Sequence, residues 1–156
     1  MFFLSSRGWS LSRRGKENKR SDLLSTRMNM REEEEYKREV IVITIERDNK
    51  RLLDIYKRGE EKDTLSERAF NNVYDRVEYA LSSSSLMDDL DEVPTLEERI
   101  RFFFDDYYFD NVPDASKSDI RYYITAFKRF FLILLREGEI DKERLSNMYS
   151  LLSEYL

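Results

Sequence analysis

The side chains of this sequence that could do chemistry are carboxylates, Lys, Tyr and Ser, and the carboxylates gather most densely just before Pro94. Four acidic residues lie close together there: Asp88, Asp89, Asp91 and Glu92. Hard cations such as Mg²⁺ and Ca²⁺ prefer oxygen ligands of this kind. The central glycine and closing glutamate of an EF-hand loop are missing, however. The sequence therefore favours solvated loop charge over a metal site.

A second group, the adjacent pair Asp105 and Asp106, has the residue types of general acid–base catalysis. Neighbouring residues on a helix point about 100° apart, so these two carboxylates do not converge on one substrate atom. The chain has no cysteine and no histidine, which excludes thiolate nucleophiles, imidazole bases and the metal sites that these residues build. Its four glycines form no phosphate-binding loop. We therefore expect no catalytic residue, no metal ligand and no cofactor, and a protein that is not an enzyme.

The elements that would position any site are organised around residues 116–138, the most apolar part of the chain. Apolar side chains recur there at the spacing of one helix face: Ile120, Tyr123, Ile124, Phe127, Phe131 and Leu134. Ser116 can cap the N-terminus of this helix, and Gly138 can end it in a left-handed conformation. The pattern predicts a central core helix with Phe127 near the middle of its buried stripe.

A second face of the same helix carries Tyr122, Ala126, Arg129, Ile133 and Arg136. Aromatic, aliphatic and guanidinium groups of this kind are typical of interface cores rather than of a solvated surface. Two interpretations stay open: another helix of the same domain covers this face, or a protein partner does. On the second interpretation we predict six partner-binding residues. Four lie on this face: Tyr122, Arg129, Ile133 and Arg136. The other two lie on the outer side of the preceding helix: Phe102 and Phe109.

The rest of the chain is predicted to form further helices joined by short loops. Capping boxes at Thr64–Glu67 and Thr95–Glu98 begin two of them, and Asp141 is an N-cap for the last. Val40–Ile45 is a run of β-branched residues, which favours a strand. Because the chain offers no second strand to pair with it, we favour a helix over residues 30–58. The alternative is a strand over residues 39–46 that pairs with a second copy or with another protein.

Charge divides the chain into a basic arm and an acidic body. Residues 1–27 have a net charge of +5 and the remainder a net charge of −10. The arm has little apolar periodicity, so we predict that residues 1–27 are disordered and that residues 28–156 form a single helical domain. An inert tail is the favoured interpretation of the arm. The alternative is that the arm binds nucleic acid. Since phosphate contacts need Lys and Arg, the binding residues would then be Arg13, Arg14, Lys16, Lys19 and Arg20.

The run Arg121–Leu152, RYYITAFKRFFLILLREGEIDKERLSNMYSLL, resembles the helical C-terminal domain of archaeal primase large subunits. In that family an Arg- and Phe-rich helix also ends in a glycine and leads into another helix. The cysteines that ligate the family's cluster are absent here, so the resemblance implies a form without the cluster. It also implies an accessory subunit of DNA replication, and it assigns no role to individual residues.

The sequence therefore predicts an all-α protein, a compact bundle of about five helices with a disordered basic N-terminal arm. Its expected function is that of a non-enzymatic accessory or adaptor subunit that binds a protein partner, within DNA replication or transcription machinery. One alternative is nucleic-acid binding through the basic arm with Arg129 and Arg136, and another is a self-assembling structural or virion protein. No uncharged run is long enough to span a membrane, and the expected compartment is the cytoplasm. Abundant Glu, Lys and Arg is typical of thermophile proteins, which fits an archaeal or viral source.

Overall fold

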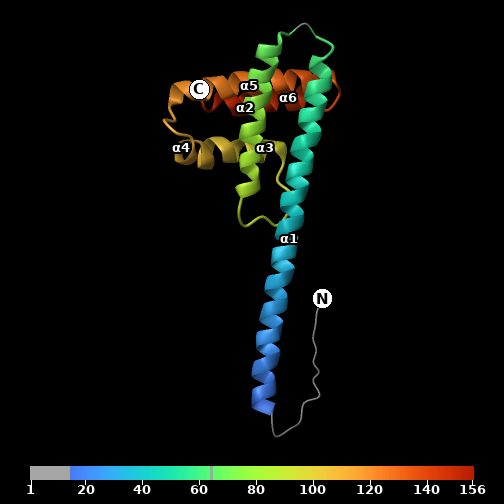
Figure 1. The fold of residues 1–156 in the computed structure, drawn as a ribbon, viewed down its shortest axis with the longest axis vertical. Coiled ribbons are helices and arrows are strands. Elements are labelled where there is room, and N and C mark those ends of the chain that lie inside the picture. Colours follow the sequence, from blue (N-terminus) through green and yellow to red (C-terminus); the bar gives the residue numbers. More distant parts are fainter. Residues whose placement is uncertain (1–14, 64) are drawn as a thin grey trace. The chain divides into compact units, whose positions relative to one another are not determined.

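The computed structural model describes residues 15–63 and 65–156, with side chains described from residue 24 onward. Its elements follow in the order α1 (Gly15–Glu60), α2 (Glu67–Ser82), η2 (Ser83–Leu86), α3 (Leu96–Phe102), η3 (Phe103–Tyr107), α4 (Tyr108–Asn111), α5 (Lys117–Arg136) and α6 (Lys142–Ser153) (Figure 1). No strand occurs within these ranges. The prediction of an all-α fold is confirmed.

By its internal contacts the chain divides into two units, residues 1–41 and residues 42–156, whereas a single helical domain over residues 28–156 stays a prediction. In the first unit the described element is the beginning of α1. The last part of the predicted arm, residues 15–27, is therefore helical in the structure. Lys, Glu, Arg and Leu recur in this stretch and are good helix formers. Residues 1–14, including Arg13 and Arg14, lie outside the described residues.

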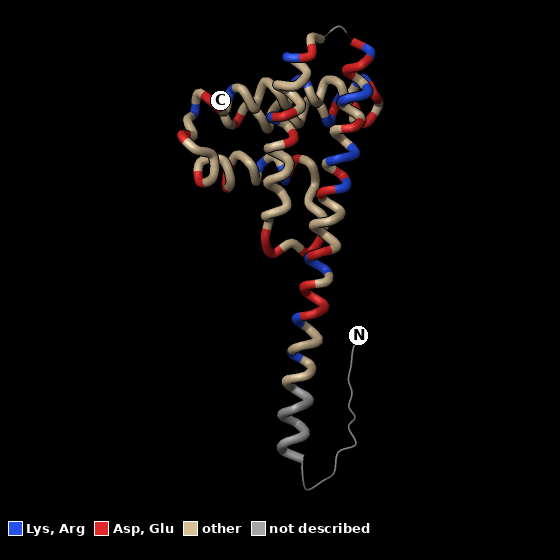
Figure 2. Tube along the Cα trace, in the orientation of Figure 1, with Lys and Arg blue, Asp and Glu red and all other residues tan. Residues whose placement is uncertain are grey.

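Within the first unit, almost every described side chain from Leu24 to Val40 is exposed. This stretch is rich in charge of both signs (Figure 2). Glu33 and Lys37 are four residues apart, as are Glu34 and Arg38, and such spacing supports an exposed helix. The β-branched run that follows, which made a strand an alternative, also continues α1.

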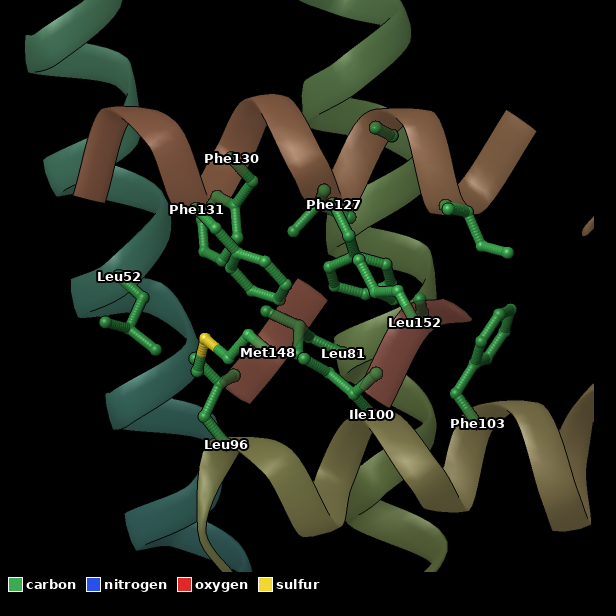
Figure 3. Close-up of a cluster of buried hydrophobic side chains, with 14 of the residues drawn as sticks. Leu52, Leu81, Leu96, Ile100, Phe103, Phe127, Phe130, Phe131, Met148 and Leu152 are labelled. Atoms are coloured by element: carbon green, nitrogen blue, oxygen red, sulfur yellow. The ribbon is translucent and has the colours of Figure 1, made fainter. Parts of the chain in front are cut away.

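The second unit buries its core around α5, whose side chains Phe127, Phe130, Phe131 and Leu134 are completely inaccessible. Side chains of α1, α2, α3 and α6 surround them (Figure 3). The contribution of α1 is a helical stripe in which Ile45, Leu52, Leu53 and Tyr56 are buried. Burial of that stripe outweighs the strand preference of the β-branched residues, because their weak helix propensity costs only a few tenths of a kcal/mol each.

Predicted caps are found at the starts of α3, α5 and α6 and at the end of α5. Thr95 and Glu98 form the predicted capping box, with backbone-to-side-chain bonds of 3.1 and 2.8 Å. Asp141 caps α6 as expected, and Gly138 has the left-handed φ of 80° that ends α5. One cap was predicted wrongly, because α2 begins at Glu67 with Ser66 as its N-cap. The predicted cap, Thr64, lies outside the described residues.

A π-helical turn separates α3 from α4. The segment η3 (Phe103–Tyr107) lies directly between α3 and α4, and the backbone N–H of Tyr108 donates to the carbonyl of Phe103, five residues earlier. Such π-bulges are rare and occur frequently at functional sites. Here the turn carries two aromatic side chains, Phe103 and Tyr107, which contact α2 and α5.

Candidate partner-binding face

The predicted second face of α5 is buried inside the second unit at Ala126 and Ile133, whereas Tyr122 and Arg136 at its two ends are exposed. Ala126 is buried and Ile133 is 0% exposed. Ile133 lies against Gly59 of α1 so closely that a Cβ on Gly59 would overlap its Cγ2 atom and would approach Glu137 Cγ to 3.1 Å. The role of Gly59 is therefore close helix packing, since α1 continues through it. The prediction that Ile133 contacts a partner is wrong because its own domain covers it.

Arg129 and Arg136, also predicted to bind a partner or nucleic acid, are held by carboxylates at the end of α1. Arg129 Nη2 donates to Glu60 Oε1 at 2.6 Å and to Asp63 Oδ2 at 2.8 Å. Arg136 Nη1 donates to the same Asp63 oxygen at 2.9 Å. The two guanidinium charges are thus neutralised by two carboxylates of the same unit, which leaves little attraction for phosphate.

The Glu60 carboxylate is almost fully buried and accepts a further bond from Tyr56, whose Oη lies 2.6 Å from Oε2. Burial, with the negative charge of Glu60, raises the pKa of Tyr56, so the hydroxyl remains protonated and serves as a donor. A buried charge is stable only when it is paired and hydrogen-bonded. Glu60 meets both conditions, and its surroundings are those of a structural ion pair.

A second buried polar network, which the sequence did not predict, joins α1 to η2 and α3. The buried guanidinium of Arg99 donates to Asn49 Oδ1 and, at 2.5 Å, to Asp48 Oδ2. Asn49 Nδ2 in turn donates to the carbonyl of Leu81 at 3.0 Å and to Ser84 Oγ at 3.3 Å. The signal in the sequence was a polar residue, Asn49, at a core position of the α1 stripe.

Two carboxylates in and beside this network have lowered pKa values. Burial alone would raise the pKa of Asp48, but hydrogen bonds and charges from Arg99 and Arg51 outweigh it. Burial would likewise raise the pKa of Glu97, but the hydrogen bond and charge of Arg144 outweigh the effect of burial. Arg144 Nη2 lies 2.9 Å from Glu97 Oε1. Each carboxylate therefore binds its proton less tightly in the folded protein than in the unfolded chain.

We expect the melting temperature to fall steeply as the pH drops through the ordinary carboxyl range. Because the folded pKa values of Asp48 and Glu97 lie below their ordinary values of 3.8 and 4.5, their stabilisation is present above that range and is lost below it. Thermal melts between pH 6 and pH 2.5 measure this loss. Asp48→Asn should be less stable at neutral pH and should show a shallower acid slope. Asp75→Asn, at an exposed carboxylate, is the control, and equal slopes for wild type and Asp48→Asn would contradict the assignment.

One part of the surface of the second unit gathers aromatic side chains. Three tyrosines from α2, η3 and α5 lie together on it, and we call them and Tyr122 the tyrosine-rich face: Tyr79, Tyr107, Tyr123 and Tyr122. The ring of Tyr79 lies 6.0 Å from that of Tyr107 and 6.4 Å from that of Tyr123. Phe103 supports the group from the core side, 6.2 Å from Tyr79 and 4.9 Å from Tyr123. The rings are thus fixed in place by one buried side chain of the π-helical turn.

The exposed members of this face are Tyr79, at 37%, and Tyr122, at 56%. The Tyr79 and Tyr107 hydroxyls lie 3.5 Å apart. This hydrogen bond, with a smaller effect of burial, raises the pKa of Tyr79 to about 12. The Tyr79 hydroxyl is therefore neutral at physiological pH, so the exposed ring of Tyr79 ends in a neutral polar group.

A guanidinium already packs on this face. Arg76 of α2 places its Cζ atom 5.0 Å from the ring centroid of Tyr122, within the distance at which a cation is attracted to an aromatic ring. Among the described residues, Arg76 makes no ion pair with a carboxylate. The face therefore accommodates a guanidinium on a ring without a carboxylate partner.

Three carboxylates lie about one helical turn from tyrosines of this face, on α2, α4 and α5. Asp75 precedes Tyr79 by one turn of α2, Asp119 precedes Tyr123 by one turn of α5, and Asp110 follows Tyr107 by three residues. Burial is the largest cause of the raised pKa of Tyr123; the charge of Arg76 lowers this pKa, and the charge of Asp119 raises it less strongly. All three carboxylates are exposed, and none makes an ion pair within the part of the chain that the structure describes.

The other predicted residues lie at different depths. Phe109 is 53% exposed and meets the buried Tyr108 edge to face at 5.0 Å, whereas Phe102 is half-buried. Of the six residues predicted to bind a partner, Tyr122 alone belongs to the tyrosine-rich face. Tyr79, its central member, was missed because a single exposed tyrosine on α2 has no distinguishing pattern in the sequence.

The carboxylates considered first for chemistry are not brought together into a site. Asp105 helps to raise the pKa of Tyr155, for which burial is the larger cause, and Asp88 to Glu92 lie in the acidic loop between η2 and α3 (Figure 2). Among the described residues no group of three or more acidic side chains is arranged to hold a metal ion. No described helix has the length and apolarity needed to cross a membrane.

Comparisons with protein-family models, with curated proteins and with solved structures find no match for this chain.

Proposed function

We propose that this is a non-enzymatic protein that binds a protein partner through its tyrosine-rich face. The main evidence for the proposal is that Tyr79 and Tyr122 are exposed on a surface that the π-helical turn supports from the core side. Tyrosine is among the residues most enriched at the energetic centres of interfaces. Its ring offers apolar area with only two rotatable bonds, and its hydroxyl offers a hydrogen bond, so little entropy is lost on binding.

The rings on this face are already ordered before any partner arrives. Tyr79 is held by ring contacts with Phe103, Tyr107 and Tyr123, and Tyr122 is held by Arg76. Binding a preorganised surface costs less free energy than ordering a loose one. An accessory or adaptor role, in which the protein supplies a ready-made surface to a larger assembly, follows from this proposal.

Nucleic-acid binding through Arg129 and Arg136 is not favoured. Both guanidinium groups are engaged by Glu60 and Asp63. The second unit carries 17 Lys and Arg residues against 25 Asp and Glu residues, a net charge of −8, which repels a phosphate backbone. A protein partner is therefore the better proposal for this unit.

The proposal is tested by comparing what different variants of the full chain capture from cells of the native source. We expect wild type and Tyr36→Ala, a control at an exposed tyrosine of the first unit, to retain the same partner. The double variant Tyr79→Ala/Tyr122→Ala should lose it, while its circular dichroism spectrum stays unchanged. With the purified partner, the dissociation constant should rise at least tenfold, about 1.4 kcal/mol. Equal affinity of all three proteins would refute the proposal.

A further inference from the structure

We infer that the tyrosine-rich face binds a basic segment of its partner, with Lys or Arg side chains placed on the tyrosine rings and paired with the bordering carboxylates. This inference rests on the proposed function and names the chemistry of the partner. Cations bind the faces of aromatic rings, and Lys and Arg side chains also donate strong charge-assisted hydrogen bonds to carboxylates. The face supplies both kinds of group, on three different elements.

The first support is the arrangement of the carboxylates. Asp75, Asp110 and Asp119 each lie about one helical turn from a tyrosine of the face, and none has an ion-pair partner among the described residues. Elsewhere in the same unit, carboxylates that border buried surface are paired, as Asp48 is with Arg99 and Glu97 is with Arg144. The face thus has three unpaired carboxylates against one guanidinium, that of Arg76, which leaves an excess of negative charge.

The second support is the position of Arg76. Its guanidinium lies over the ring of Tyr122 at 5.0 Å, so this surface already holds one cation on one of its rings. Tyr79 offers a comparable ring that no cation of the described residues covers. An arginine of a partner placed on Tyr79 would therefore repeat an interaction that the chain makes with its own Arg76.

The third support is the charge of the whole unit. A net charge of −8 over residues 42–156 (Figure 2) attracts a basic segment and raises its rate of association. The same charge disfavours nucleic acids and anionic membrane surfaces. The charge of the unit and the carboxylates at the border thus select the same class of partner.

The test uses the full chain and a fluorescein-labelled peptide of twelve residues in which arginine and serine alternate. A second peptide with glutamate in place of arginine is the charge-reversed control. Fluorescence anisotropy at 50 mM and 150 mM NaCl measures binding. We expect the arginine peptide to bind and the glutamate peptide not to bind. Raising the salt concentration should weaken the interaction, because exposed charges are screened.

Variants then separate this face from the general negative charge of the unit. Tyr79→Ala should raise the dissociation constant at least tenfold, while Tyr79→Phe, which keeps the ring, should change it less than threefold. Neutralising the border, by Asp75→Asn with Asp110→Asn and Asp119→Asn, should also raise it at least tenfold. The matched control removes three exposed carboxylates elsewhere in the second unit and should change it less than threefold: Glu46→Gln, Glu61→Gln and Glu143→Gln.

Three results would overturn the inference. The first is equal loss of affinity in the border variant and the matched control, which would mean that net charge alone attracts the peptide. The second is no binding of the arginine peptide while a captured partner still depends on Tyr79 and Tyr122; the proposed function would then stand and the partner would not be basic. The third is a dimer in sedimentation velocity that Tyr79→Ala dissolves, which would assign the face to a second copy of this chain.

Discussion

We expect Ile133→Asp to unfold the second unit. Ile133 is 0% exposed and packs against the backbone of Gly59, so no water can reach a carboxylate placed there. Loss of the buried isoleucine costs about 2–5 kcal/mol, and burial of an unpaired polar or charged group adds several more. The sum is comparable with the whole free energy of unfolding of a small domain, roughly 5–15 kcal/mol. Circular dichroism should show loss of helix at room temperature.

The control for this prediction is Thr125→Asp on the same helix. Thr125 is exposed and lies four residues from both Arg121 and Arg129, so an added carboxylate meets water and positive charge. Its free energy of unfolding should stay within about 0.5 kcal/mol of wild type. A folded Ile133→Asp protein with lost partner binding would instead restore the interpretation of this face as an interface.

The second large effect is expected for Phe127→Ala. The Phe127 ring is 0% exposed and meets the rings of Phe104, Phe130 and Phe131 at 6.2, 6.4 and 5.7 Å. Truncation removes apolar burial and leaves a cavity among side chains of several helices (Figure 3). Such a change typically costs about 3–5 kcal/mol, and urea unfolding monitored by circular dichroism measures it.

Phe109→Ala makes the same chemical change at a surface position. Because Phe109 is 53% exposed and lies mainly against Tyr108, we expect its free energy of unfolding to fall by less than about 1 kcal/mol. A difference between the two variants of less than 1 kcal/mol would mean that the Phe127 pocket collapses around the smaller side chain. Such a result would also mean that Phe127 does not lie at the centre of the core.

The amino-acid sequence by itself determined the helical class and several helix ends. The α5 stripe from Ile120 to Leu134 repeats with a helical period, and Phe127 was correctly placed at its centre. Thr95, Asp141 and Gly138 act at the positions predicted for them. These features depend on hydrogen bonds and steric limits within a few residues, so they can be recognised without any knowledge of tertiary packing.

Tertiary structure alone decided which side of α5 is internal and where the candidate binding surface lies. Ile133 and Tyr122 belong to the same predicted face, yet Gly59 packs against one and leaves the other exposed. Tyr79, Tyr107 and Tyr123 are separated by 28 and 16 residues along the chain, and the packing of α2, η3 and α5 brings them together. Local periodicity carries no information about such contacts, because they depend on how whole helices pack against one another.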